Sequence, residues 1–193
     1  KLVVANVEKK QRKRNPAPPF TTSTLQQEAA RKLSFTAQKT MRIAQQLYEG
    51  VDIGGTAVGL ITYMRTDSVN LAQEAVAEIR ALIAERYGAA NVPDKPNVYK
   101  TKSKNAQEAH EAIRPTVAAQ TPEAVKSHLS ADQQKLYDLV WKRTMACQMI
   151  HATIDTVSVD LTAGEGNIFR ATGSTIVDPG FIMVYQEGVD ERK

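Results

Sequence analysis

A chain of 193 residues with 42% hydrophobic side chains is long enough for one or two domains with cores of their own. Its single cysteine, Cys147, excludes an internal disulfide and indicates a reducing compartment, and the sequence contains no apolar run of 18 residues that would predict a membrane-spanning helix. The net charge is +4, with basic side chains gathered in residues 1–14 and 95–104, which favours a polyanionic partner such as nucleic acid; two solvated lysine-rich loops are the alternative.

The front of the chain predicts a strand followed by two helices. Residues 1–8 alternate in polarity, and because a lysine stands directly before this strand-like run, we expect a piece of a larger protein. The proline-rich "NPAPPF" predicts an extended hinge. A helix over 21–33, capped by Ser23 or Thr24, and a second helix over 37–48 form a pair typical of a helix-turn-helix unit.

A short strand and a long helix come next. A glycine-rich loop followed by "LITYM" predicts a strand over 60–64, and helices followed by a strand are compatible with a winged-helix-like domain. Asn70 with Gln73 predicts the capping box of a helix that ends at Gly88. Residues 89–104, rich in proline and lysine, predict a loop.

Three further helices are predicted in the second half of the chain. "NAQEAHEAIRP", residues 105–115, predicts a short helix capped by Asn105 and stopped by its final proline. Thr121 with Pro122 predicts the start of another. Ser130 predicts the cap of a long helix whose apolar stripe marks a core face.

Just past residue 151 the spacing of apolar side chains changes from about 3.6 to 2. "TVSVDLTAG" and "GFIMVYQEG" therefore predict strands. The simplest fold is α+β and mainly α, in which a helical, winged-helix-like domain over 15–150 is inserted into a β-rich domain built from 1–14 and 151–193.

Tyr63 and Arg65 lie two positions apart on the predicted strand, so we expect their side chains on one face. Burying an arginine without an anionic partner is costly, and the strand ends in Thr66, Asp67 and Ser68 at a helix start, where anions are favoured. A phosphate bound by Arg65 and Thr66 explains this grouping; a packed or solvated strand face is the alternative.

A tyrosine beside an arginine is a candidate nucleophile. Phenols titrate near pH ~10 and attack weakly at neutral pH unless a cation or a base favours the phenolate. An adjacent arginine also stabilises charge on a transferring phosphoryl group. An aryl phosphodiester stays activated, so attack by an alcohol reverses it. Tyr63 and Arg65 therefore suit an enzyme that cuts and reseals a strand without an energy source.

The motif "EAHEAIRP" offers a second group of candidate residues. His110 and Arg114 are four positions apart in the predicted helix and are expected on one face. The histidine suits proton transfer and Arg114 suits phosphate binding, as in a nucleic acid; a solvated helix held by intrahelical ion pairs is the alternative. Because His110 and Glu111 are adjacent, they point about 100° apart on a helix, and metal binding is not predicted.

The motifs around Tyr63 resemble those of a known family. "QQLYEG", a variable spacer and "GLITYMRTDS" together resemble the active-site signature of type IA DNA topoisomerases. "PPFTTSTLQQEA" before them and "SKNAQEAHEAIRPT" after them resemble segments of the bacterial members in the same order. The resemblance covers essentially the whole chain and is strongest from Pro18 to Cys147.

The resemblance implies specific roles for four residues. Tyr63 matches the nucleophile that attacks one DNA strand and holds its 5′ end as a phosphotyrosine, and Arg65 matches the arginine that contacts the scissile phosphate. His110 matches a histidine near that site that is expected to hydrogen-bond Asp67. The implied activity is transient single-strand cleavage, strand passage and religation, which relaxes negative supercoils.

The resemblance also implies an architecture, partners and a cofactor. The helical middle would be a movable domain that carries the tyrosine, and the β pieces would belong to the arch of a toroidal enzyme. The expected partner is single-stranded DNA and not a membrane, and the parent enzyme is expected to be a monomer in the bacterial cytoplasm, at the nucleoid. The family also needs Mg²⁺ on an acidic cluster, and no Asp-x-Asp-x-Glu pattern occurs here. We therefore expect the Mg²⁺ ligands outside this fragment, no cofactor within it, and no activity of the fragment alone.

Two other functions compete with this interpretation. A winged-helix DNA-binding module without catalysis is supported by the two front helices almost as well as the enzyme is. The combination of Tyr63 and Arg65 discriminates between them, because a module that only reads DNA needs no tyrosine beside a phosphate-binding arginine. A structural helical domain without a nucleic-acid role is disfavoured by the basic clusters.

Overall fold

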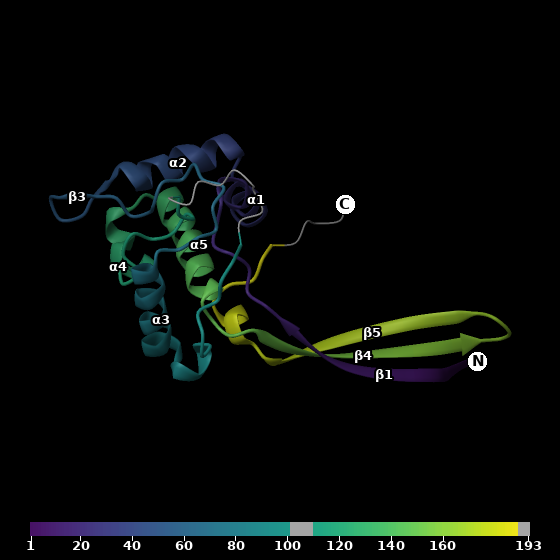
Figure 1. Cartoon of the computed structure of the whole chain (residues 1–193). Helices are drawn as coiled ribbons and strands as arrows, with labels where there is room; N and C mark the ends of the chain where they lie inside the picture. Colours follow the sequence, from purple (N-terminus) through teal and green to yellow (C-terminus); the bar gives the residue numbers. More distant parts are fainter. Residues whose placement is uncertain (101–109, 189–193) are drawn as a thin grey trace.

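A computed structural model describes residues 1–100 and 110–188 of the chain. A helical body carries a long antiparallel ribbon that projects from it (Figure 1). The chain is therefore mixed α/β, with its helices in the middle of the sequence, as predicted. In chain order the elements are β1 (Leu2–Arg14), α1 (Thr22–Leu33), α2 (Ala37–Glu49), β2 (Val51–Asp52), β3 (Ala57–Val58), α3 (Gln73–Tyr87), η1 (Ala89–Asn91), α4 (Pro122–Val125), η2 (Lys126–His128), α5 (Ala131–Cys147), β4 (Ala152–Ala163), β5 (Ile168–Asp178) and η3 (Gly180–Met183).

The ribbon is a three-stranded antiparallel sheet in the order β1-β4-β5. β1 pairs with β4 from Leu2, opposite Ala163, to Arg14, opposite Ala152. The predicted strand over 1–8 thus continues to Arg14. Because the first strand pairs with the strand that follows the last long helix, the entry and exit of the helical body lie side by side.

One face of the ribbon is apolar and open to solvent in the described part of the chain. Register places Val4 opposite Leu161, and Leu161 opposite Phe169, so the three side chains share a face. Val4 and Phe169 are each 57% exposed. The ribbon therefore has no core of its own, and the hydrophobic core lies in the helical body.

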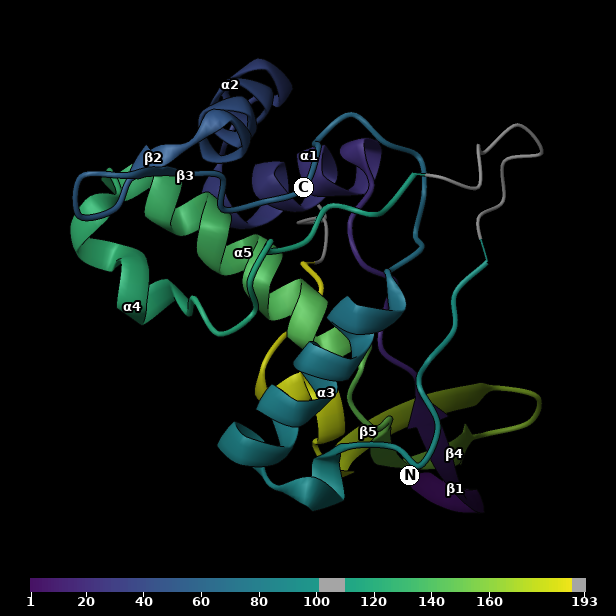
Figure 2. The same cartoon turned by 60° about the vertical axis from the view of Figure 1, so that its left-hand side comes forward.

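α5 runs through the centre of the helical body, with α1, α2 and α3 packed around it (Figure 2). Ser130 caps this helix as predicted, in a capping box with Gln133. Its large buried side chains include Tyr137 and Trp141, and the Trp141 indole Nε1 donates to the Ala118 carbonyl at 2.9 Å. Burial of these two aromatic side chains removes a large apolar area from water and stabilises the body.

The start of α1 differs from the prediction. Thr21, and neither Ser23 nor Thr24, is the N-cap residue. The Thr21 hydroxyl accepts from the Thr24 N–H, and the Thr24 hydroxyl accepts from the Thr21 N–H, which completes a capping box. Several hydroxyl residues in a row allow more than one cap in the sequence, and packing of the helix selects one of them.

The start of α3 also differs from the prediction, because Ala72 rather than Asn70 is its N-cap residue. Alanine offers no side-chain acceptor, and the Ala72 N–H donates to Glu111 Oε2 at 3.1 Å. A carboxylate from a distant segment therefore satisfies an N–H at this helix end, where a local cap was expected. That partner is invisible to a local sequence pattern.

The predicted strand over 60–64 is wrong. Only Ile61 forms a β-bridge, an isolated one with Pro115. Leu60 and Ile61 are adjacent and both buried, together with Met64, which the alternation of a half-buried strand does not allow. The main-chain groups of this segment bond to threonine hydroxyls and to a distant segment rather than to a neighbouring strand.

The predicted helix over 105–115 is wrong where the structure describes it. Residues 110–115 are extended, whereas 105–109 lie outside the described residues. The Ile113 N–H donates to the Phe20 carbonyl at 2.8 Å, within an isolated β-bridge. Main-chain donors that a helix would use internally are thus taken by other segments, and His110 and Arg114 share no helix face.

The C-terminal strands also need correction. "GFIMVYQEG" forms the 3₁₀ turn η3 and an irregular tail instead of a strand, with Phe181 and Tyr185 buried on the helical body. The second long strand of this region is β5, which the sequence pattern does not predict. All side chains of β5 are exposed, so no apolar alternation marks it.

Candidate active site around Tyr63

Residues 59–66 form the loop that carries Tyr63, and we call it the Tyr63 loop. It begins in close contact with the end of α2. A Cβ on Gly59 would lie 2.7 Å from the Tyr48 carbonyl oxygen, so only glycine fits there. The N–H of the next residue, Leu60, donates to the Leu47 carbonyl at 2.8 Å. The start of the loop, which follows the β2–β3 hairpin, is therefore held against the end of α2.

Thr62 joins the Tyr63 loop to residues 110–116. Its N–H donates to the Arg114 carbonyl at 2.9 Å. Its hydroxyl donates to the Ala112 carbonyl at 2.7 Å and accepts from the Arg114 N–H at 3.0 Å. The Thr116 hydroxyl donates to the Gly59 carbonyl, at the start of the loop, at 2.7 Å. The residue before the tyrosine is thus held by a segment about 50 positions away.

Thr22, the first residue of α1, holds the other side of the loop. Its N–H donates to the Thr66 carbonyl at 2.9 Å. Its hydroxyl donates to the Met64 carbonyl at 2.7 Å and accepts from the Thr66 N–H at 2.9 Å. Met64 is buried beneath the loop, whereas Tyr63 is 50% exposed and Arg65 is exposed. The anchored backbone therefore presents the phenol and the guanidinium outward.

Two adjoining clefts open beside the Tyr63 loop. The first has a volume of about 250 Å³ and is lined by Thr62, Tyr63, Arg65, Thr66, His110 and Glu111. The second, of about 440 Å³, is lined by Thr21, Thr22, Ser23, Arg65, Thr66, Asp67 and His110. The two clefts share Arg65, Thr66 and His110. Along the two clefts a phenolic hydroxyl, a guanidinium and an imidazole are therefore within reach of one bound molecule.

The structure brings together five of the six residues singled out in the sequence: Tyr63, Arg65, Thr66, Asp67 and His110 line one cleft or both. Asp67 and His110 both line the second cleft although they lie 43 positions apart in the chain. A hydrogen bond between them stays a prediction. Their grouping depends on the extended segment at 110–115, which places the histidine next to the loop.

Arg114 is the exception among the predicted site residues. Its side chain is 13% exposed, and it forms a two-pronged ion pair with Glu111, with Nε to Oε2 at 2.7 Å and Nη2 to Oε1 at 3.1 Å. Its Nη1 donates to the Pro115 carbonyl at 3.0 Å. Arg114 lines neither cleft. Its contact with DNA stays a prediction, and its observed contacts fix the segment that holds Thr62.

Glu111 is a residue that sequence reasoning did not select. The hydrogen bond from Arg114 lowers the pKa of its carboxyl, against the opposing effect of burial, and the bond from the Ala72 N–H lowers it further. Glu111 therefore carries its charge at neutral pH and ties the start of α3 to residues 110–116. The available signal was the pair of opposite charges three positions apart in "EAHEAIRP", which the sequence analysis interpreted as part of a helix.

Tyr48 is a second residue that the site prediction omitted. Its ring contacts that of Tyr63 edge to face, with 5.3 Å between centroids and 62° between planes. Both rings are partly exposed, so the contact steadies the Tyr63 ring without burying its hydroxyl. Tyr48 stands in "QQLYEG", one of the motifs that carry the family resemblance, and this was the signal that could have found it.

A metal site and a reactive cysteine are the two other kinds of reactive site considered for the described residues. Among the described residues, no group of three His, Cys, Asp or Glu side chains is arranged to hold a metal ion. Cys147 is buried, and burial raises the pKa of its thiol to about 12, so it is a packed, unreactive side chain. The chemistry available to the described residues is concentrated around Tyr63.

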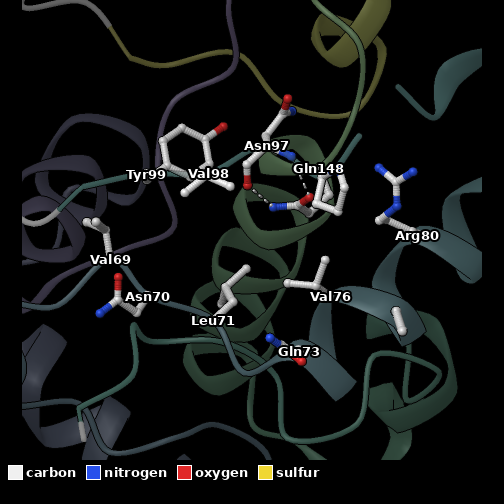
Figure 3. Close-up of a pocket in the computed structure, with 12 residues that line it drawn as sticks. Val69, Asn70, Leu71, Gln73, Val76, Arg80, Asn97, Val98, Tyr99 and Gln148 are labelled. Atoms are coloured by element: carbon white, nitrogen blue, oxygen red, sulfur yellow. Dashed lines mark hydrogen bonds between the residues drawn. The ribbon is translucent and has the colours of Figure 1, made fainter. Parts of the chain in front are cut away.

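Two larger cavities lie away from the Tyr63 loop. One of about 580 Å³ lies between α3 and residues 96–99, with Leu71, Val76 and Val98 on its walls (Figure 3). A second of about 540 Å³ adjoins it. Neither is lined by a residue that the sequence analysis named as a candidate site residue. The smaller clefts beside Tyr63 are the candidate site because they bring a phenol, a guanidinium and an imidazole together.

The comparisons with known proteins all lead to one family. A family model described as "DNA topoisomerase" matches residues 1–193. DNA topoisomerase 1 of Xylella fastidiosa (strain Temecula1) is 62% identical over 193 residues, which are 100% of this chain and 24% of that protein. DNA topoisomerase 1 of Rickettsia felis is 57% identical over 189 residues, 97% of this chain and 24% of that protein.

Full-length topoisomerase I from Thermotoga maritima has a similar structure, with a TM-score of 0.83 and 40% identity, over 99% of this chain and 31% of that one. The chain spans about a quarter of the length of the curated relatives described above. Within residues 1–100 and 110–188, no helix has the length and apolar character needed to cross a membrane.

Proposed function

The chain belongs to the DNA topoisomerase family, and from that premise we propose that it is the part of a type IA enzyme that carries the strand-cutting tyrosine. The activity belongs to a larger parent protein, because the chain spans only about a quarter of its relatives. The parent cuts one strand, passes another strand through the break and reseals it, which relaxes negative supercoils.

Tyr63 is the proposed nucleophile. Its Oη attacks a backbone phosphorus, a bond from Oη to phosphorus forms, and the bond from phosphorus to the 3′ oxygen breaks. The phenolic proton leaves to a base or to water, and the 3′ oxygen takes up a proton and departs as a hydroxyl. One phosphodiester replaces another, so attack by the same 3′ hydroxyl restores the strand without ATP. The single observation that carries this proposal is the half-exposed Tyr63 beside Arg65 at a cleft that also holds His110.

The neighbouring side chains have proposed roles that follow from their chemistry. Arg65 binds the non-bridging oxygens of the scissile phosphate and stabilises the charge that develops on them. Thr66 donates a hydrogen bond to an adjacent phosphate. His110, oriented by Asp67 across the second cleft, suits proton transfer to or from the reacting oxygens.

A magnesium ion in the parent is part of the proposal, held by acidic residues outside this chain. When bound, it would neutralise phosphate charge near the reacting strand. The residues described here perform the tasks of attack, phosphate binding and proton transfer. The proposed substrate is single-stranded DNA, and the parent works as a monomer in the bacterial cytoplasm, at the nucleoid.

The architecture of the parent is also proposed. The ribbon would form part of the arch of a toroidal enzyme, whose other elements cover its apolar face. The helical body would be the movable domain, and α1 and α2 followed by the β2–β3 hairpin suit a winged-helix-like arrangement. A winged-helix module without catalysis is the alternative function, and the exposed Tyr63–Arg65 pair favours the enzyme.

The test is covalent trapping in the full-length parent. The protein is mixed with a 5′-labelled single-stranded oligonucleotide and with a 3′-labelled one, denatured rapidly, and the attached residue is mapped by proteolysis and mass spectrometry. We expect the label 3′ of the break to remain on Tyr63. Tyr63→Phe loses only the hydroxyl and should form no adduct, whereas Tyr48→Phe, the matched control on the contacting ring, should still form it. DNA attached to Tyr48 or Tyr87, or an adduct with Tyr63→Phe, would overturn the proposal.

A further inference from the structure

We infer that Thr22 is a positioning residue for strand cleavage, acting through the backbone on both sides of Arg65; the inference rests on the proposed function. Its hydroxyl donates to the Met64 carbonyl at 2.7 Å and accepts from the Thr66 N–H at 2.9 Å. Its own N–H donates to the Thr66 carbonyl at 2.9 Å. The same hydroxyl also lies 3.1 Å from the Thr66 carbonyl oxygen. Thr22 is therefore hydrogen-bonded to main-chain groups on both sides of Arg65.

The position of Thr22 is itself fixed. It is the first residue of the 12-residue helix α1 and directly follows the N-cap residue Thr21, which forms a capping box with Thr24. The helix is anchored by Leu25 and Ala29, which are fully buried. Threonine is stiff at χ1, so its hydroxyl has few alternative directions. A rigid helix start thus sets the place of the turn that follows Tyr63.

The turn has little other support at this point. Met64 is buried, so its side chain points inward, but the side chain does not itself bond to the two peptide groups that flank Arg65. The threonine hydroxyl bonds to one carbonyl and one N–H of those peptide groups, which sets the direction in which Arg65 leaves the backbone. Tyr63 directly precedes Met64, whose carbonyl accepts this bond. Loss of the hydroxyl should therefore displace the guanidinium and the phenol relative to each other.

The consequence is a defect in rate rather than in binding. A displacement of about 1 Å in reacting groups costs up to about 100-fold in rate. Affinity for single-stranded DNA comes largely from many phosphate contacts, which one rotated peptide leaves intact. A residue that merely stabilised the fold would alter rate and unfolding temperature together, and its conservative variant would show no selective rescue of rate.

The experiment compares Thr22→Val with Thr22→Ser in the full-length parent. Valine keeps the shape and removes the hydroxyl, whereas serine keeps the hydroxyl. Single-turnover formation of the covalent adduct is measured with a labelled oligonucleotide, and affinity is measured with the same oligonucleotide. We expect Thr22→Val to slow adduct formation by about 10–100-fold with affinity close to that of the unmodified protein, and Thr22→Ser to restore most of the rate. Should Thr22→Val fail to fold, Thr22→Ala makes the same comparison.

Thr40→Val is the matched control. Thr40 is fully buried in α2, lines neither cleft, and donates from its hydroxyl to the Thr36 carbonyl at 2.9 Å. The same substitution there removes one hydrogen bond and should lower the unfolding temperature while leaving the adduct rate unchanged.

The outcomes separate the two proposals. If the unmodified parent forms no adduct, or forms it with Tyr63→Phe, the proposed function fails and the role of Thr22 fails with it. If the adduct forms on Tyr63 but Thr22→Val cleaves at the normal rate, or is no slower than Thr40→Val, the positioning role alone is refuted. A parallel loss of affinity and rate in Thr22→Val also refutes it.

Discussion

The ion pair between Glu111 and Arg114 should stabilise the chain, and by more than an ordinary surface pair. Arg114→Met keeps much of the aliphatic bulk and removes the two bonds to the Glu111 carboxylate, together with the bond to the Pro115 carbonyl. Among the described residues, Glu111 would then keep the bond from the Ala72 N–H alone. The residues that hold Thr62 would lose their main side-chain support.

The magnitude follows from burial. Hydrogen bonds to charged groups contribute about 1.5–3 kcal/mol each where solvent is excluded. Arg114 is 13% exposed but Glu111 is 32% exposed, so solvent screens the pair in part and the bonds do not add in full. We expect Arg114→Met to lower the free energy of unfolding by about 2 kcal/mol at neutral pH.

The pH dependence has a definite sign. The hydrogen bond from Arg114 lowers the pKa of Glu111 below its usual 4.5. A lowered pKa in the folded state contributes stability above the unfolded-state value, and that stability is lost as the pH falls through the folded-state pKa. The difference between Arg114→Met and the unmodified chain should therefore shrink as the pH is lowered below about 4.5.

The assay is urea unfolding of the 193-residue chain, followed by circular dichroism over a series of pH values. Lys142→Met is the matched control, because Lys142 pairs with Asp138 at 2.8 Å while the two side chains are 44% and 34% exposed. That loss should be below about 0.5 kcal/mol. Equal losses for the two variants, or a loss from Arg114→Met that does not change with pH, would refute the reasoning.

Three further outcomes are expected. Arg65→Lys in the full-length parent keeps the charge but loses the planar fork, so adduct formation should slow by about 10²–10³-fold while single-stranded DNA still binds. Quench-flow and binding assays measure these two quantities. An unchanged rate would show that Arg65 does not stabilise the transition state. The isolated chain should bind single-stranded DNA weakly, with log affinity falling against log salt by about 0.7 for each phosphate contacted; a titration without salt dependence contradicts electrostatic binding. The isolated chain with magnesium should not relax negatively supercoiled plasmid, and robust relaxation on a gel would show that the machinery is complete within it.

The sequence predicted that Tyr63 and Arg65 lie together, but it predicted the wrong local structure for them. Tyr63 and Arg65 were expected together on a strand face, and both are presented at one cleft, but from a loop. The outward direction of both follows from the anchors at Thr22 and Thr62, whose partners lie about 40 to 50 positions away. No window of neighbouring residues contains those partners.

The remaining errors have similar causes. The apolar side chains of "GFIMVYQEG" form a continuous run, and such a run does not distinguish a strand from another buried segment. In the structure this segment forms a 3₁₀ turn and a tail, with Phe181 and Tyr185 packed on the helical body. β5 is exposed on both faces, so its pairing with β4 through main-chain bonds left no periodic signature. The extended form of residues 110–115 likewise comes from bonds to Phe20 and to the Tyr63 loop.

Local sequence patterns were sufficient for the elements whose signals are local: helix α2, helices α4 and α5 with their caps, and the change to strands after residue 151. These depend on side-chain periodicity and on bonds that reach three or four residues. Only the tertiary structure decided that His110 lies beside Tyr63, that Arg114 is committed to Glu111, and that Thr22 holds the loop. The physical reason is that hydrogen-bond partners of an irregular segment are chosen by whatever the packed core brings within about 3 Å.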